Sequence, residues 1–301
     1  MRFGHWRFQH FLLAAVLALS GAAASAGQNY ARPELLIETG ELAKILGQPN
    51  VRLIDAAEGT GYQRAHIAGA VNIYYLDLSR LDERKKNGFP LSQAEAERVF
   101  GAAGIDAATQ VIIYDSGEGN SASGVWFVLD FFGHKNVKVL NGGFRKWLKE
   151  NRLVTQDVPA PEKKKFTAKP DAERIVTRAW MEKNLQTKEA MVVDTRSFNE
   201  FIGKDMRPGA SRGGHIPGAT HLEWTRFSDK LNSFKSAEQI EKALNQRGIT
   251  KDTKIVTYCQ SGIGRSTDVA LAMKLIGYDN VVEYSGSWEE WSVDPRLPIE
   301  R

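Results

Sequence analysis

The stretch KIVTYCQSGIGRSTDVALAMKLIGYDNVVEYSGSWEEW, from Lys254 to Trp291, decides the fold. It aligns without a gap with QVIIYDSGEGNSASGVWFVLDFFGHKNVKVLNGGFRKW, from Gln110 to Trp147. Each copy has an apolar, β-branched run, a turn containing glycine, a helical pattern and a second apolar run. Repetition on this scale indicates two domains of one fold.

A second pair of segments extends the repeat toward the N-terminus. VRLIDAAEGTGYQRAHIAGAVNI (Val51–Ile73) corresponds to AMVVDTRSFNEFIGKDMRPGASRGGHIPGATHL (Ala190–Leu222). In each copy an apolar run ends in an acid and is followed by a loop and the pattern HI-x-GA. We interpret the two acids and the two histidines as structural, holding turns and entering the next strand; they are Asp55, Asp194, His66 and His215.

Strands and helices alternate in both copies, which predicts an α/β fold with mainly parallel sheets and helices on both faces. The predicted strands are Val51–Ile54, Val111–Tyr114, Val137–Leu140, Met191–Val193, Ile255–Tyr258 and Val281–Glu283. The predicted helices are Gln93–Ala102, Val125–Phe132, Ala237–Gln246 and Val269–Ile276. We expect an N-terminal domain over residues 30–155, a linker over 156–170, which contains three prolines, and a C-terminal catalytic domain over 171–301.

Cys259 stands at the end of an apolar strand and just before a helix, so loop amides and the positive end of the helix dipole favour its thiolate form. We expect it in the cleft between the domains, beyond the carboxyl ends of the strands. The segment that follows Cys259 is predicted to bind the substrate anion with its backbone amides, the candidate residues being Gln260, Ser261, Gly262, Ile263, Gly264 and Arg265. Asp115 occupies the corresponding place in the first copy, and we interpret it as a vestigial loop residue.

The first residues are typical of a signal peptide. Arg2 and Arg7 make a basic start, Phe11–Leu19 is a short apolar core, and residues 24–26 give the small-x-small cleavage pattern. The apolar core is too short to cross a bilayer, so residues 1–26 are expected to be removed rather than to anchor the protein. A signal of this length predicts export to a Gram-negative periplasm.

Composition limits the class of function. Removing Arg2 and Arg7 lowers the net charge from +4 to +2, and no basic stripe with interleaved aromatic residues appears, which argues against nucleic-acid binding. The six histidines are scattered and there is one cysteine, so no metal site is expected. Exported proteins usually pair their cysteines in disulfides; a single unpaired thiol therefore indicates chemical use.

This arrangement resembles the tandem-domain rhodanese family, the thiosulfate and 3-mercaptopyruvate sulfurtransferases. The resemblance covers roughly residues 30–301 and rests on the HI-x-GA segments, YDSGEG, FGHKNVKVLNGGF, GSWEEW and the single cysteine of the second copy. It implies that Cys259 takes the outer sulfur of a small donor anion as a persulfide and passes it to a thiol, a protein thiol included, or to cyanide. It also implies a non-catalytic N-terminal domain in which an acid, here Asp115, stands in place of the cysteine. No metal or organic cofactor is required; we expect a monomer without a stable membrane anchor.

Two departures from the family pattern bear on substrate and mechanism. The loop CQSGIGR is one residue longer than usual, the extra position being Ile263 or Gly264, and Glu200 stands where an arginine for the donor anion is expected. Arg207 and Arg212 are the candidates to replace that arginine, beside Arg265.

The longer loop leaves two alternatives open. The spacing Cys-x5-Arg-Ser at Cys259, Arg265 and Ser266 is also that of cysteine-dependent phosphatases, whose arginine holds two oxygens of a phosphate or arsenate. A non-catalytic persulfide carrier is the other alternative. Ser261 and Ser266 are read either as hydrogen-bond donors to the sulfur or as helix caps, and two tryptophans of the last helix as packing residues; they are Trp288 and Trp291.

Overall fold

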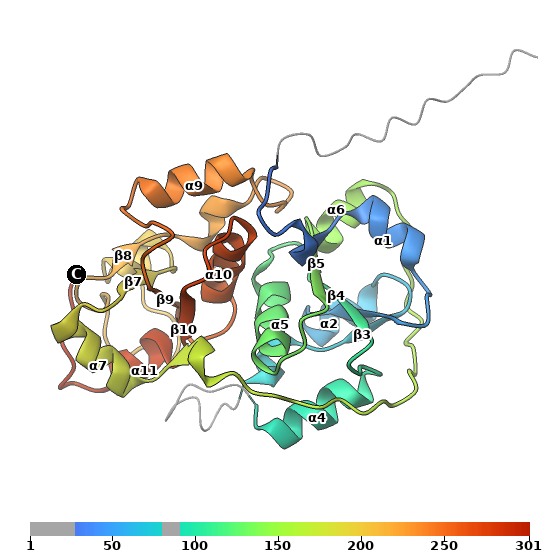
Figure 1. Cartoon of the computed structure of the whole chain (residues 1–301), viewed down its shortest axis with the longest axis horizontal. Coiled ribbons are helices and arrows are strands. Elements are labelled where there is room, and N and C mark those ends of the chain that lie inside the picture. Colours follow the sequence, from blue (N-terminus) through green and yellow to red (C-terminus); the bar gives the residue numbers. More distant parts are fainter. Residues whose placement is uncertain (1–27, 80–90) are drawn as a thin grey trace, which may run out of the picture.

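The computed structural model of the protein describes residues 28–79 and 91–301. The predicted signal peptide, residues 1–26, lies outside this range. Figure 1 shows two lobes side by side, one formed by each copy of the repeat. The fold class expected from the sequence is confirmed.

The N-terminal domain is built on a five-stranded parallel sheet in the order β1-β5-β4-β2-β3. Its strands are β1 (Leu36–Ile37), β2 (Val51–Asp55), β3 (Ala70–Asn72), β4 (Gln110–Tyr114) and β5 (Val137–Leu140). Its helices are α1 (Thr39–Ile45), α2 (Gly59–Arg64), α4 (Gln93–Ala102), α5 (Asn120–Phe131) and α6 (Gly143–Lys149). A single turn of 3₁₀ helix, η2 (Tyr75–Leu78), follows β3.

The C-terminal domain repeats this topology with the strand order β6-β10-β9-β7-β8. Its strands are β6 (Ile175–Val176), β7 (Met191–Asp194), β8 (Thr220–His221), β9 (Ile255–Tyr258) and β10 (Val281–Tyr284). Its helices are α7 (Arg178–Thr187), α8 (Phe198–Phe201), α9 (Ala237–Asn245), α10 (Arg265–Leu275) and α11 (Ser287–Val293), with 3₁₀ turns η3 (Ala172–Arg174) and η4 (Trp224–Phe227). Because β4 and β9 are the central strands, the residue after each lies at the middle of its sheet's carboxyl edge.

Alternation along the strands sorts the core into layers. In β9, Ile255 joins the hydrophobic cluster that contains α9 and α10, whereas Val256 and Tyr258 join the cluster of α7 and α11. The first of these clusters continues across the domain boundary into α4 and α5. The two domains therefore share one core, with α5 packed on α10 between the sheets (Figure 1).

Both inter-domain helices begin earlier than their apolar patterns indicate. α5 starts at Asn120 and α10 at Arg265, not at Val125 and Val269. Their first turns are polar but largely buried, because small hydroxyl side chains meet there across the interface. Ser123 Oγ lies 3.4 Å from Thr267 Oγ1 and 3.3 Å from the Gly264 carbonyl oxygen.

The segment 156–170 has no helix or strand, and it packs against the N-terminal domain. Phe166 is buried in the shared core, and the amide of Lys164 donates to the Gly101 carbonyl. Large hydrophobic side chains are exposed just before this segment, at Leu153, and near its start, at Val158.

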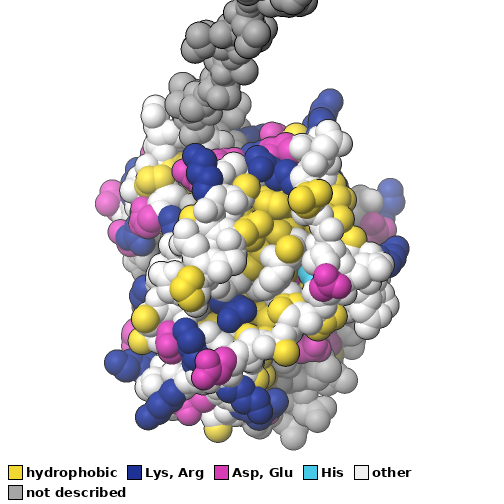
Figure 2. Space-filling model, turned by 90° about the vertical axis from the view of Figure 1, so that its right-hand side faces the viewer, with side chains coloured by type: hydrophobic (Ala, Val, Ile, Leu, Met, Phe, Trp, Pro, Cys, Tyr) yellow, Lys and Arg dark blue, Asp and Glu magenta, His cyan; other side chains and the backbone are white. Residues whose placement is uncertain are grey.

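Figure 2 shows hydrophobic side chains gathered in the middle of one face, with basic and acidic side chains interspersed around them. No helix within the described residues has the length and apolarity to cross a membrane.

Candidate active site

Cys259 lies at the floor of a cavity between the two domains, as expected. The side chain follows β9 directly and is 3 % exposed. The cavity has a volume of about 720 Å³. The N-terminal domain contributes Tyr75, Glu118 and Asn120, and the C-terminal domain contributes Ser197, Arg207, Pro208, Glu223, Trp224, Thr225, Cys259, Gln260, Ser261, Ile263 and Arg265.

Backbone contacts fix the position of the cysteine. The Cys259 amide donates to Ser287 Oγ at 3.1 Å, and the Cys259 carbonyl accepts from the Trp288 amide at 3.0 Å. Both partners lie at the start of α11, so the turn between β10 and α11 fixes the backbone of Cys259. Trp288 and Trp291 are buried in the core beneath it, which confirms their packing role.

The thiol meets a carbonyl group and not the ring of amides that the sequence predicts. Cys259 Sγ donates to the Gly262 carbonyl oxygen at 2.6 Å, and the Gly264 amide is engaged by Thr267 Oγ1 at 3.0 Å. A protonated thiol is a donor and therefore attracts an acceptor. The prediction that backbone amides surround the sulfur is therefore wrong for the protonated thiol.

The corresponding loop of the N-terminal domain does form that ring, around a carboxylate. Asp115 Oδ1 accepts from the amides of Gly117, Glu118 and Gly119 at 2.9, 3.2 and 3.1 Å. Asp115 Oδ2 accepts from those of Ser121 and Ala122 at 3.1 and 3.0 Å. Asp115 is therefore not vestigial. It organises its loop, and it shows that this turn binds an anion at the position that Cys259 occupies in the other copy.

Glycine at position 262 is required by close packing. Its φ is +97°, and a Cβ atom there would lie 2.4 Å from the Ser285 carbonyl oxygen. Only glycine fits this approach.

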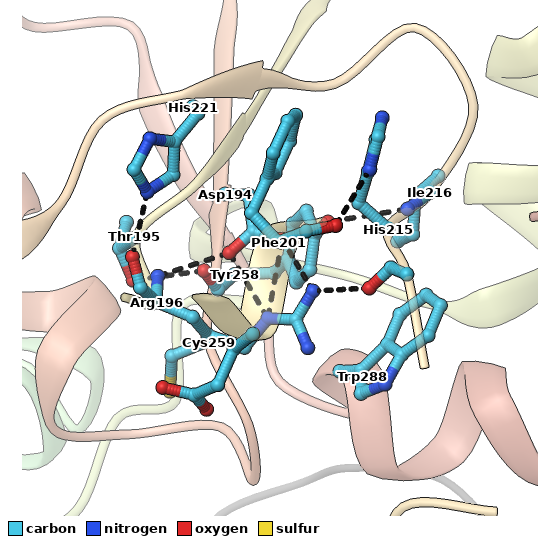
Figure 3. Close-up of polar contacts among 12 residues, drawn as sticks. Asp194, Thr195, Arg196, Phe201, His215, Ile216, His221, Tyr258, Cys259 and Trp288 are labelled. Carbon is cyan, nitrogen blue, oxygen red and sulfur yellow. Dashed lines mark hydrogen bonds and ion pairs between the residues drawn. The ribbon is translucent and has the colours of Figure 1, made fainter. Parts of the chain in front are cut away.

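A buried ionic cluster supports the strand beneath Cys259 (Figure 3). Asp194 pairs with Arg196 at 2.6 Å and accepts from the Tyr258 hydroxyl at 2.5 Å. The Arg196 guanidinium lies over the Trp288 ring, 4.6 Å from its centroid. Asp55 is the corresponding acid of the N-terminal domain. It accepts from the Ala57 amide at 2.9 Å, and burial raises its pKa to about 6. The structural interpretation of both acids is confirmed.

The two HI-x-GA histidines also have structural contacts. His66 stacks on Tyr62 and lies 2.9 Å from the Tyr62 carbonyl oxygen through Nδ1. His215 stacks on Phe201 and contacts the Phe201 carbonyl in the same way (Figure 3). The backbone of each histidine also forms an antiparallel bridge with the end of its own domain, His66 with Thr155 and His215 with Glu300.

Arg265 lines the cavity, but its charge is already matched. Its Nη1 and Nη2 donate to the two carboxylate oxygens of Glu200 at 2.7 and 3.0 Å. Burial opposes ionisation of Glu200, yet Arg265 overrides it and lowers the pKa of that carboxyl to about 2. Arg207 is 3.9 Å from the same carboxylate, with a side chain 64 % exposed. The Arg265 side chain is 15 % exposed, so Arg207 is the more exposed of these two cations in the cavity wall.

Arg212 does not belong to the site, contrary to the sequence-based prediction. Its guanidinium makes four hydrogen bonds to backbone carbonyls of the C-terminal segment, from 2.6 to 3.2 Å, and Arg212 does not line the cavity. These acceptors are Trp291, Ser292, Asp294 and Leu297. Among the described residues there is also no group of three or more histidine, cysteine or acidic side chains able to hold a metal ion.

One functional candidate was missed from the sequence: a glutamate within β10. Glu283 is fully buried, and Ser266 Oγ lies 2.6 Å from its Oε1 and 3.4 Å from Cys259 Sγ. Burial raises the pKa of Glu283 to about 8, so this carboxyl keeps its proton at neutral pH. A charged residue type inside an otherwise apolar parallel strand was the available signal.

Glu283→Gln is expected to alter how stability depends on pH. Between the unfolded value of about 4.3 and the folded pKa, the native state binds one proton more than the unfolded chain, so this group makes unfolding easier by up to about 1.4 kcal/mol per pH unit as pH rises. From about pH 5 to 8 the melting temperature of the wild type should therefore fall relative to that of the variant. Above pH 8 the difference between the two melting temperatures should stay constant. Thermal melts of both proteins across this range measure it, and a constant gap throughout would contradict the assignment.

Comparisons with known proteins agree with the geometry. The family of rhodanese-like domains matches residues 38–150 and 177–294. A thiosulfate sulfurtransferase of Pseudomonas aeruginosa is 31% identical over 88% of this chain and 97% of its own. The sulfur carrier protein TtuD of Thermus thermophilus is 32% identical over 90% and 98%. The crystal structure of SseA from Escherichia coli, described as a 3-mercaptopyruvate sulfotransferase, superposes with a TM-score of 0.73 at 24% identity, covering 84% of this chain and 98% of SseA.

Proposed function

This chain belongs to the rhodanese-like family as a tandem-domain sulfurtransferase, and we propose that it moves a sulfane sulfur from thiosulfate or 3-mercaptopyruvate to a thiol or to cyanide. The intermediate is a persulfide on Cys259. We propose the periplasm as its location, from the signal-like residues 1–26.

The reaction proceeds in two displacements at sulfur. The Cys259 thiolate attacks the outer sulfur of the donor, and the bond to the rest of the donor breaks with its electron pair. Sulfite leaves from thiosulfate; pyruvate enolate leaves from 3-mercaptopyruvate and takes up a proton. An acceptor thiolate or cyanide then attacks the outer sulfur of the persulfide, and the Cys259 thiolate is released.

The observation that supports this best is the carboxylate of Asp115 in its ring of five amides. The two loops are copies of one another, and Asp115 places an anion two bonds beyond its Cβ atom. A persulfide on Cys259 places its anionic outer sulfur two bonds beyond the corresponding Cβ atom. The first copy therefore carries a permanent anion where the second needs a transient one.

The charges around the cavity favour this function over phosphate-ester chemistry. A phosphatase of the Cys-x5-Arg type needs the arginine to bind two phosphate oxygens, but here both terminal nitrogens of Arg265 are held by Glu200. Arg207, which lines the same cavity and has a side chain 64 % exposed, is the cation that we assign to the small donor anion.

Intact mass spectrometry tests the proposal. Incubation with thiosulfate or 3-mercaptopyruvate should add about 32 Da, one sulfur atom, to the chain, and cyanide should remove it as thiocyanate. Repeated turnover supports an enzyme, whereas a single transfer per chain supports the carrier alternative. No mass gain from either donor, with hydrolysis of a chromogenic phosphate ester, would overturn the proposal in favour of the phosphatase.

A further inference from the structure

A buried carboxyl group lies directly behind the active-site loop, and neither displacement step uses it. Glu283 on β10 is the pairing partner of Thr257 on β9. Alternation points both side chains toward α10, because their neighbours Tyr258 and Tyr284 face the opposite cluster. Glu283 thus lies under the first turn of α10, where Ser266 is located.

Three buried groups form a chain that ends at the sulfur. Ser266 Oγ is 2.6 Å from Glu283 Oε1, 2.9 Å from the Gly262 carbonyl oxygen and 3.4 Å from Cys259 Sγ. Glu283 Oε2 accepts from Thr257 Oγ1 at 2.8 Å. Three acceptors therefore surround a hydroxyl that has one proton to give.

The charge on Glu283 decides where that proton points. A neutral acid donates its own proton to Ser266 Oγ and leaves the serine hydroxyl to donate onward to the sulfur. A carboxylate would instead take the serine proton, and it would place a second negative charge near the thiolate. Complete burial with only two hydroxyl partners favours the neutral form.

We propose that Glu283 is a positioning residue that, as a neutral acid, directs the Ser266 hydroxyl to Cys259 and so stabilises the thiolate and the persulfide anion. The inference rests on the proposed function, since it concerns the nucleophile of that reaction. The proton stays on Glu283 throughout, so the step needs no further reactant.

Most of the other ionisable groups on elements packed against β10 have partners of opposite charge or hydrogen-bonding partners of their own. Arg265 pairs with Glu200. Lys274 of α10 and Arg174 of η3 lie near Asp130, and Glu290 of α11 accepts from Tyr284 on the opposite face of the sheet. Asp268 of α10 is the exception: burial and the nearby Asp115 of the other domain both raise the pKa of its carboxyl. Cys259 is thus the ionisable group that lies one hydroxyl away from Glu283.

The rate at which iodoacetamide alkylates the chain tests this directly, because Cys259 is its sole cysteine. Losing a hydrogen bond to an anionic sulfur should slow alkylation of Glu283→Leu about tenfold or more near neutral pH. Glu283→Gln, whose amide still donates to Ser266, should react like the wild type near neutral pH and exceed it in alkaline solution, where Glu283 ionises. Glu290→Gln, the same change at a buried acid that does not reach Ser266, is the matched control and should follow the wild-type profile.

A double variant separates positioning from a general loss of structure. Ser266→Ala should slow alkylation to a similar extent, and adding Glu283→Leu should then change the rate less than twofold, since the effect passes through the hydroxyl. Equal rates for Glu283→Leu and wild type, or independent effects in the double variant, would overturn the inference. If Glu283→Leu does not fold, the alkaline comparison of Glu283→Gln with wild type decides. Failure of the wild type to take up sulfur, with the alkylation pattern intact, would instead count against the proposed function alone.

Discussion

Cys259→Ser is expected to abolish sulfur transfer, with thiocyanate formation from thiosulfate and cyanide falling at least about 10³-fold. A serine hydroxyl reproduces the bond that the thiol donates to the Gly262 carbonyl oxygen, so the loop should keep its shape. Oxygen, however, does not ionise near neutral pH at this position and forms no persulfide. The loss should therefore appear in turnover and in the mass gain together.

The chain's single cysteine makes this a sharp test. A thermal melt of the variant within a few degrees of the wild type would show that the fold is intact. Residual transfer near the wild-type rate would mean that the acceptor attacks the donor directly in the cavity, and the persulfide mechanism would have to be abandoned.

Much of the fold was predictable because the chain repeats itself. The internal strands β4 and β9 are mostly apolar and buried on both faces, and the register of the repeat placed Asp115 and Cys259 at matching positions. The edge strands β1 and β6 were missed, since each is two residues long and too short for a periodic pattern. The early starts of α5 and α10 were missed because their first turns bury hydroxyl groups against the other domain, which hides them from a search for apolar spacing.

The parts of the site that are close together in sequence were predictable, whereas the contacts between residues distant in sequence were not. Cys259 and its loop follow from a strand, a turn and a helix in succession. The pairing of Arg265 with Glu200 joins residues far apart in sequence, and so does the link from Glu283 through Ser266. Arg212 shows the opposite error. Its place in the sequence suggested that it could replace the arginine expected at position 200, but its guanidinium binds carbonyl groups of the C-terminal segment instead.

Asp115→Ala is expected to lower the free energy of unfolding of the N-terminal domain by about 3–5 kcal/mol. The Asp115 side chain is buried and accepts from five backbone amides, which lie in the turn after β4 and the first turn of α5. Alanine leaves those amides without an acceptor, and each buried donor then bears its desolvation penalty. Asp115→Asn keeps one acceptor oxygen but loses the charge, so its effect should be intermediate.

Denaturant titration of the three proteins measures this series, with circular dichroism and tryptophan fluorescence followed in parallel because two domains need not unfold in one step. Since α5 packs on α10, destabilisation of the first copy should also reach the active site: the alanine variant should lose thiocyanate formation at lower denaturant than the wild type. In the absence of denaturant its turnover should be close to normal, because Asp115 does not touch the sulfur. Unchanged stability of Asp115→Ala would show that the loop closes without an anion, and the argument from the first copy to the Cys259 persulfide would lose its basis.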